Sequence, residues 1–183
     1  MPLSRRERMR RHFYRGWADE SPVREYEPQP DLENLPWEAK CFWLKYSNGF
    51  HHPRSVFVGY DKDGGNLYVG RLVDGGDLLP CKVVPNHRCA YAASRNQEIN
   101  TLQYEVLVIG SGVVEWQKAS DGDVPARALP VGYTKDGEVS YSVRVQIDGT
   151  TTPGKLVPSE GKCCISYDCK EFTFQEYEVL TVQ

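Results

Sequence analysis

The sequence predicts an all-β protein in which two tandem antiparallel β repeats form one pseudo-symmetric unit, with a short N-terminal helical or extended arm. Two observations predict this fold. Residues 43–108 overlay residues 116–181 without a gap after a shift of about 73 positions, and about a third of the aligned pairs are identical. From residue 41 onward, short runs rich in Val, Tyr, Leu and Ile alternate with turns built on Gly, Asp and Pro, which is typical of short antiparallel strands.

Residues 1–40 precede the repeats as a basic arm and an acidic, proline-spaced connector. Ser4 and Glu7 have the spacing of a capping box. Three apolar residues then recur at every fourth position on one helical face: Met9, Phe13 and Trp17. Because six arginines occupy much of the remaining surface, residues 1–18 are suited to contact an anionic membrane or an acidic partner. The alternatives are a helix that docks on the protein's own core and an arm that stays solvated.

The first repeat is predicted at residues 41–110 and the second at residues 111–183. Expected strands of the first copy read SVFVGY, NLYVGRLV, KVVP, CAYAAS and YEVLVI. Those of the second read ALPVGY, VSYSVRVQI, KLVP, CCISYD and FTFQEYEVLTV. The turns DKDGG (61–65) and TKDGE (134–138) place a glycine where a tight hairpin needs a positive φ. Each copy is too short to cover its own hydrophobic face, so we expect the copies to pack together, with edges that exchange or pair strands.

Composition excludes several classes of protein. The formal net charge of −3 argues against a nucleic-acid binder. No apolar run is long enough to span a bilayer, and no secretory signal follows Met1, so a cytoplasmic location is expected, with non-classical secretion as the alternative. The six cysteines do not recur between the copies, so reduced thiols are expected. Neither a catalytic motif nor a metal-binding spacing stands out, so we predict no enzyme activity, no cofactor and no metal. The DKDGG turn in particular lacks the glutamate that closes a calcium loop, since Leu72 stands there.

Polar residues beside aromatic ones remain in the turns. A carboxylate can accept hydrogen bonds from two neighbouring sugar hydroxyls, and a lysine can donate to a third oxygen. Asp61 and Lys82 lie in neighbouring turns of the first copy, and Asp136 and Lys155 lie in those of the second. Such pairs can bind a neutral sugar weakly and without metal, with avidity from multivalency. The structural alternative is that each Asp makes an Asx turn and each Lys faces water.

The motifs YVGR, PxKV and YEVL, in fixed order over residues 41–182, resemble the DM-nine repeat family. The resemblance implies a calcium-independent, mannose-specific lectin that forms homodimers and recognises microbial mannans in innate immunity. It implies that Asp61 and Lys82 hold the sugar. In the second copy Thr134 replaces the aspartate, so a second sugar site depends on Asp136 acting with Lys155. Related repeats also occur in cytoskeletal proteins of nematode sperm, which leaves open the alternative of a structural or regulatory protein that self-assembles through its repeats.

Overall fold

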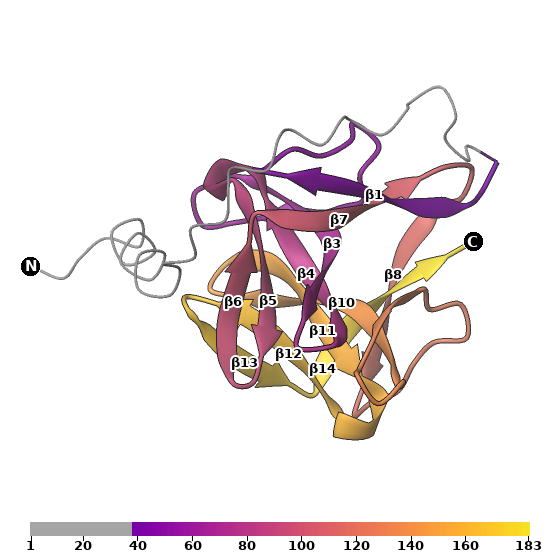
Figure 1. Cartoon of the computed structure of the whole chain (residues 1–183). Coiled ribbons are helices and arrows are strands. Elements are labelled where there is room, and N and C mark those ends of the chain that lie inside the picture. Colours follow the sequence, from indigo (N-terminus) through magenta and orange to yellow (C-terminus); the bar gives the residue numbers. More distant parts are fainter. Residues whose placement is uncertain (1–37) are drawn as a thin grey trace, which may run out of the picture. The chain divides into compact units, whose positions relative to one another are not determined.

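The computed structural model describes residues 38–183, and within them it is built almost entirely of antiparallel strands (Figure 1). The first copy contains β1 (Cys41–Ser47), β2 (Phe57–Tyr60), β3 (Asn66–Asp74), β4 (Asp77–Val84), β5 (Cys89–Ser94), β6 (Gln97–Thr101) and β7 (Gln103–Ile109). The second copy contains β8 (Val114–Ser120), β9 (Pro130–Tyr133), β10 (Val139–Ile147), β11 (Thr150–Val157), β12 (Lys162–Tyr167), β13 (Lys170–Phe174) and β14 (Glu176–Val182). The predicted N-terminal arm lies outside the described residues.

Each strand of the first copy recurs in the second after the same shift of about 73 positions. The 3-10 turn η2 (Pro85–His87) likewise recurs as η3 (Pro158–Glu160). Both turns end on a residue with positive φ, which is Arg88 in the first copy and Gly161 in the second. The predicted all-β fold with two tandem antiparallel repeats is therefore confirmed.

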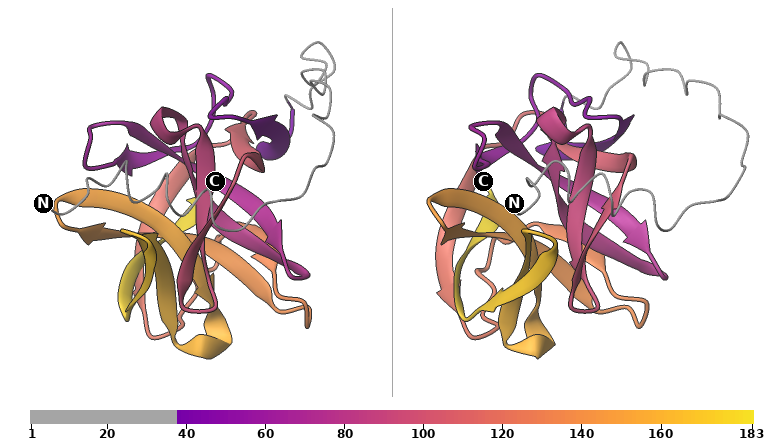
Figure 2. Two further views of the ribbon diagram at one scale, coloured as in Figure 1. Left: turned by 60° about the vertical axis from the view of Figure 1, so that its left-hand side comes forward. Right: turned by 90° about the vertical axis from the view of Figure 1, so that its left-hand side faces the viewer.

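The strand order shows how the two copies join. The first copy contributes the order β1-β7-β3-β4-β5-β6, and the second continues it as β13-β12-β11-β10-β14-β8. β6 and β13 meet at the pair Gln97–Lys170. β9 pairs with β10 of its own copy and also with β4 of the other, through Tyr133 and Leu78. The first-copy strands, indigo to pink, and the second-copy strands, salmon to yellow, thus pack as two halves of one unit (Figures 1 and 2).

Two glycines at equivalent positions allow this close approach between copies. A Cβ on Gly132 of β9 would overlap the carbonyl oxygen of Leu78 in β4. A Cβ on Gly59 of β2 would lie 2.7 Å from the carbonyl oxygen of Thr151 in β11. Side chains cannot fit at such backbone contacts, so glycine at these two positions brings each copy against the other.

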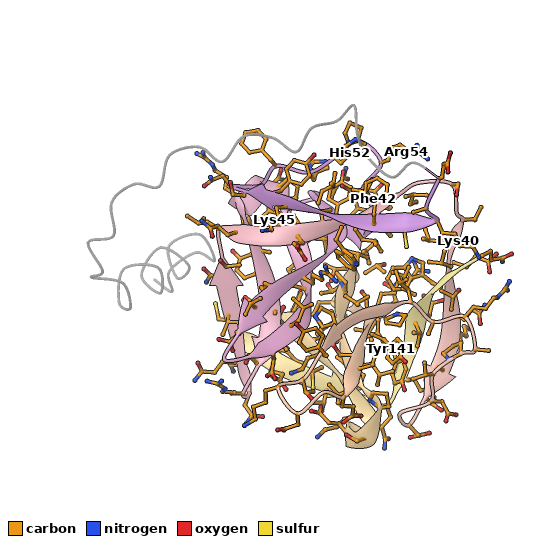
Figure 3. All side chains as sticks on the ribbon, turned by 45° about the vertical axis from the view of Figure 1, so that its right-hand side comes forward. Lys40, Phe42, Lys45, His52, Arg54 and Tyr141 are labelled. Atoms are coloured by element: carbon orange, nitrogen blue, oxygen red, sulfur yellow. The ribbon has the colours of Figure 1, made fainter. Side chains whose placement is uncertain are left out.

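Two equivalent hydrophobic clusters, one in each copy, form part of the core of residues 38–183. Their members alternate along the strands with outward-facing residues, as expected for strands with one buried face. The first cluster includes Leu72, Leu79, Val83, Tyr104 and Val106. The second includes Val145, Leu156, Ile165, Tyr177 and Val179. Side chains fill the space between the two halves (Figure 3).

A triad of one arginine, one glutamate and one tryptophan occurs at equivalent positions of the two copies. Arg71 donates from Nε to Glu105 at 2.5 Å, and its guanidinium carbon lies 4.2 Å from the centre of the Trp43 ring. Arg144 repeats the arrangement with Glu178 at 2.6 Å and Trp116 at 4.8 Å. These repeated residues therefore have a structural role, since the guanidinium stacks on an aromatic face while a carboxylate orients it.

The histidines and cysteines of the described residues form no reactive centre. His52 lies near β1 (Figure 3), where its Nδ1 accepts a hydrogen bond from the backbone N–H of Arg54 at 3.0 Å. None of the six cysteines, all of which lie within residues 38–183, forms a disulfide. Burial raises the pKa of Cys89 to about 11 and that of Cys163 to about 12, so these thiols stay protonated at neutral pH. Between residues 38 and 183 no helix is long and apolar enough to cross a bilayer.

Candidate functional site

The duplication creates two equivalent positions at which a site can form. At the first position, the turn after β2 lies near the lysine of β4 and the 3-10 turn η2. At the second, the turn after β9 lies near the lysine of β11 and the 3-10 turn η3. The first position contains the predicted pair Asp61 and Lys82, and the second contains Asp136 and Lys155. The same backbone elements surround both, so any difference between them comes from the side chains.

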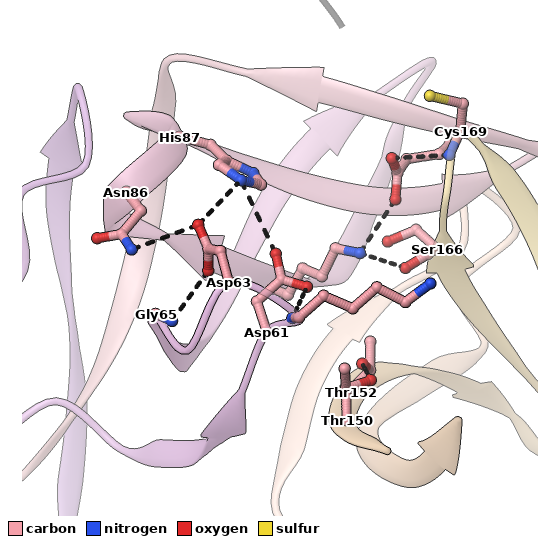
Figure 4. Close-up of polar contacts among 12 residues, drawn as sticks. Asp61, Asp63, Gly65, Asn86, His87, Thr150, Thr152, Ser166 and Cys169 are labelled. Carbon is pink, nitrogen blue, oxygen red and sulfur yellow. Dashed lines mark hydrogen bonds and ion pairs between the residues drawn. The ribbon is translucent and has the colours of Figure 1, made fainter. Parts of the chain in front are cut away.

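At the first position Lys82 is buried, with a side chain only 2% exposed. Its Nζ lies 3.0 Å from the Glu98 carboxylate and also donates to the carbonyl oxygen of Ser166, which belongs to the second copy (Figure 4). The other Glu98 oxygen accepts from the backbone N–H of Cys169 at 3.3 Å, again across the copies. Lys82 and Glu98 therefore form a buried, hydrogen-bonded ion pair that connects the two repeats.

Two aromatic rings enclose the ammonium group of Lys82. Its Nζ lies 5.4 Å from the centre of the Tyr91 ring and 5.9 Å from that of Tyr167. The exposed Lys62 also contacts the Tyr167 ring, with its Nζ 4.8 Å from the centre of that ring. Cation–π contacts of this kind stabilise a desolvated lysine. The N–H donors of Lys82 are directed into the protein, toward Glu98 and Ser166.

Asp61 is also buried, with 7% of its surface exposed. Its Oδ1 accepts from the backbone N–H of Lys62 at 2.9 Å, and His87 Nε2 lies 3.9 Å from its Oδ2 (Figure 4). The same histidine nitrogen lies 3.8 Å from Asp63 Oδ2. Asp61 and Lys82 thus lie in one packed region, where Asp61 orders its own turn and Lys82 holds the repeats together.

The second position is open instead. A cavity of about 200 Å³ lies there, and both Asp136 and Lys155 line it. The remaining walls combine residues of both copies: Asp77, Leu79, Tyr133, Thr134, Lys135, Ser140, Val157 and Glu160. Asp77 comes from the first copy, and its Oδ1 accepts a hydrogen bond from the backbone N–H of Lys135 at 2.6 Å. The cavity is therefore complete only when both repeats are present.

The chemistry of this cavity suits a ligand with several hydroxyl groups. Asp77, Asp136 and Glu160 supply carboxylate acceptors, and Lys155 supplies a charged donor. The ring of Tyr133, which is 52% exposed, provides an apolar surface at the rim. Among residues 38–183, no group of His, Cys, Asp and Glu could hold a metal ion. The arrangement can bind hydroxyls directly through hydrogen bonds.

The structure brings together the predicted pair Asp136 and Lys155 in one cavity, and it buries the predicted pair Asp61 and Lys82. Sequence reasoning missed the contributions of Ser140 and Glu160, and it did not place Asp77 beside the second copy. The overlay contains a signal for two of these, because Ser140 aligns with Leu67 and Glu160 aligns with His87. Ser140 thus replaces a leucine that belongs to the core of the first copy, so the second copy has a hydroxyl group where the first has apolar atoms.

The fold and the site define a duplicated, all-β repeat protein with a polar cavity lined by residues of both copies. The family model of the DM9 repeat matches residues 61–174 and 140–183. The chain therefore belongs to the DM9 repeat family, a family that includes carbohydrate-binding lectins.

A solved structure shares this fold. The nematode sperm cell motility protein MFP2B matches with a TM-score of 0.60 and 14% sequence identity, over 87% of this chain and 50% of that chain. At this level of identity the likeness concerns the fold alone. The chain thus spans about half the length of that relative. No curated protein sequence matches the chain significantly.

Proposed function

We propose that this protein is a calcium-independent carbohydrate-binding lectin that recognises mannose-containing glycans, such as microbial mannans, and acts in innate pattern recognition. The observation that carries the proposal is the open cavity lined by Asp136 and Lys155. Membership of the DM9 repeat family supports it. The proposal assigns binding, rather than catalysis, to the site.

The sugar would be bound by the acceptors and donors that line the cavity. Carboxylates of Asp136 and Glu160 accept from neighbouring hydroxyls, while Lys155 donates to a third oxygen. The exposed ring of Tyr133 covers the C–H surface of the pyranose. Because such a site is small and open to water, its affinity for a monosaccharide is expected in the micromolar to millimolar range. A homodimer, which we include in the proposal, would raise the avidity for polymeric mannan.

In this proposal the second-copy cavity is the principal sugar site. Asp61 and Lys82 would contribute a further site only if a ligand could displace the contacts of Lys82 with Glu98 and Ser166. That displacement would leave the Glu98 carboxylate without its charged partner in a buried position, which is costly. The cavity at Lys155 requires no such change.

Calorimetric titration with methyl α-mannoside and with mannan, each with and without EDTA, tests the proposal. Asp136→Asn and Lys155→Met should weaken binding about tenfold or more, because each removes a charge-assisted hydrogen bond. Lys162→Met is the matched control, since Lys162 is an exposed lysine outside the cavity lining, and it should bind normally. Wild-type affinity in both cavity variants, or loss of binding in EDTA, would contradict the proposal.

A second candidate is a structural or regulatory protein that self-assembles through its repeats. The strand order of residues 38–183 ends at β1 and β8, so each of these strands has one unpaired edge. Such edges can pair with another chain. The basic segment 1–18 would then contact an acidic partner or a membrane. Sedimentation velocity of the full chain and of a chain lacking residues 1–18, over a range of salt concentrations, would reveal concentration-dependent assembly. A monomer at all concentrations would exclude this candidate.

A further inference from the structure

Ser140 of β10 has a buried hydroxyl group whose surroundings indicate a ligand-binding role. The residue is 1% exposed, and it lines the cavity of the second copy. Within the described residues its Oγ has no hydrogen-bond partner. Buried side-chain hydroxyls are nearly always hydrogen-bonded, because an unsatisfied one loses its contacts with water and gains nothing in return. Because Ser140 also lines the cavity, a partner from outside the chain is expected at this atom.

The equivalent residue of the first copy shows that the fold does not need a hydroxyl here. Leu67 occupies that position in β3 and is 0% exposed. The repeat thus accepts an apolar side chain at this point of the sheet, and the first copy has one. The serine occurs in the copy that has the cavity. We therefore associate its hydroxyl group with the cavity and not with the stability of the fold.

The cavity has room for more than a solvent molecule. Its volume of about 200 Å³ is several times the roughly 30 Å³ that one water occupies in the liquid. Lys155 and Glu160 line it together with Ser140, and Asp77 from the first copy adds a further carboxylate. A ligand that reaches Ser140 is therefore surrounded by groups that bind hydroxyls.

We propose that Ser140 is a ligand-contacting, specificity-determining residue, whose Oγ hydrogen-bonds one hydroxyl of the bound hexose at the inner end of the cavity. This inference rests on the proposed carbohydrate-binding function and deepens it. The ligand class is a neutral polyol with one hydroxyl directed into the cavity while its neighbours meet the carboxylates and Lys155. A sugar that lacks this hydroxyl leaves Ser140 unpaired and binds less tightly, because a site built to bind a hydroxyl disfavours an analogue without it.

Three single variants separate ligand contact from folding. Ser140→Ala removes the hydroxyl, and Ser140→Leu fills the space with the residue that the first copy has at Leu67. Ser142→Ala is the matched control: Ser142 lies two residues further along β10, is 0% exposed and also lacks a hydrogen-bond partner among the described residues, but it does not line the cavity. Thermal unfolding of each variant shows whether it is folded.

Titration of each variant with methyl α-mannoside and with its monodeoxy analogues tests the inference. We expect about tenfold weaker binding for Ser140→Ala, no detectable binding for Ser140→Leu, and wild-type affinity for Ser142→Ala. One monodeoxy analogue should bind to the wild type more weakly than methyl α-mannoside does. The same two ligands should bind to Ser140→Ala with equal affinity, since the substitution and the missing hydroxyl remove the same hydrogen bond. A merely structural role of Ser140 would not produce this loss of discrimination.

The outcomes separate this inference from the proposed function. If Ser140→Ala and Ser140→Leu bind mannoside like the wild type while Lys155→Met does not, the Ser140 contact is wrong and the lectin site stands. Equal discrimination against every deoxy analogue by wild type and Ser140→Ala would also overturn the contact. If the wild-type protein binds no glycan, both proposals fail together.

Discussion

The two equivalent positions of this protein have the same backbone but different roles. Lys82 and Lys155 occupy the same point of the repeat, yet Lys82 is buried in an ion pair with Glu98, and Lys155 lines an open cavity. The comparison teaches that a duplicated fold can bury a lysine in an ion pair in one copy and leave the equivalent lysine beside an open cavity in the other. A single lysine could not hold the copies together and also remain available to a ligand.

Neighbouring side chains cause this difference. Glu98 aligns with Glu171, but within the described residues no ion pair joins Glu171 to Lys155. Instead, burial raises the pKa of the Cys164 thiol, and the Glu171 carboxylate, which accepts a hydrogen bond from this thiol, raises it further. Tyr91, which covers Lys82, is replaced by Cys164 in the second copy. The smaller residue leaves Lys155 without the aromatic cover that encloses Lys82.

Breaking the buried ion pair should have the largest effect on the comparison. Glu98→Gln leaves Lys82 buried without its charged partner, so we expect a loss of about 3 kcal/mol in the free energy of unfolding. That loss corresponds to a decrease of roughly 6–12 °C in Tm for a chain of this size. Calorimetric or circular-dichroism melting measures it. Glu171→Gln is the equivalent variant of the second copy and should lower Tm far less; equal losses in the two variants would contradict the division of roles.

Exchanging the residues before the two lysines should have the next largest effect. Gly154 precedes Lys155, and a Cβ there would overlap the carbonyl oxygen of Cys164, so Gly154→Cys should lower stability by about 2–3 kcal/mol. The reverse change, Cys81→Gly, removes a buried thiol and should cost about 1–2 kcal/mol. Urea unfolding of both variants tests this order. A Gly154→Cys variant as stable as the wild type would show that β11 and β12 can separate without cost.

The smallest expected effect concerns pH. Hydrogen bonds from the Ser159 hydroxyl and backbone N–H lower the pKa of Glu138. Because the folded pKa lies below the unfolded one, the contribution of Glu138 to stability is present above its ordinary pKa and is lost as pH falls through the folded value. The first copy has Gly65 at this position and no such carboxylate. The Tm difference between wild type and Glu138→Gln should therefore shrink between pH 6 and about pH 3. A difference that stays constant with pH would contradict this assignment.

Much of the fold could be predicted because it depends on local pattern. The self-overlay located both repeats, and glycines at turns such as DKDGG predicted the hairpins that the structure shows. The repeated Trp43 and Trp116 had no predicted role, since their arginine and glutamate partners lie far away in the sequence. Contacts of that kind depend on strand register, which a pattern of residues does not specify.

The candidate site was predicted only in part for the same reason. Lys155 and Asp136 were predicted together from neighbouring turns, and both line the cavity. The burial of Lys82 was not foreseen, because its partner Ser166 belongs to the other copy. The position of Asp77, a residue of the first copy, in the cavity of the second depends on the pairing of β4 with β9.

The sequence by itself determined the duplication, the all-β class and the position of most turns, because alternation of side chains and the φ requirements of glycine act over a few residues. Only the tertiary structure decided which lysine is buried and which lines a cavity. That outcome depends on contacts between the copies, where a carboxylate, a carbonyl group or the size of one side chain from a distant segment determines whether a charge is enclosed or accessible to a ligand.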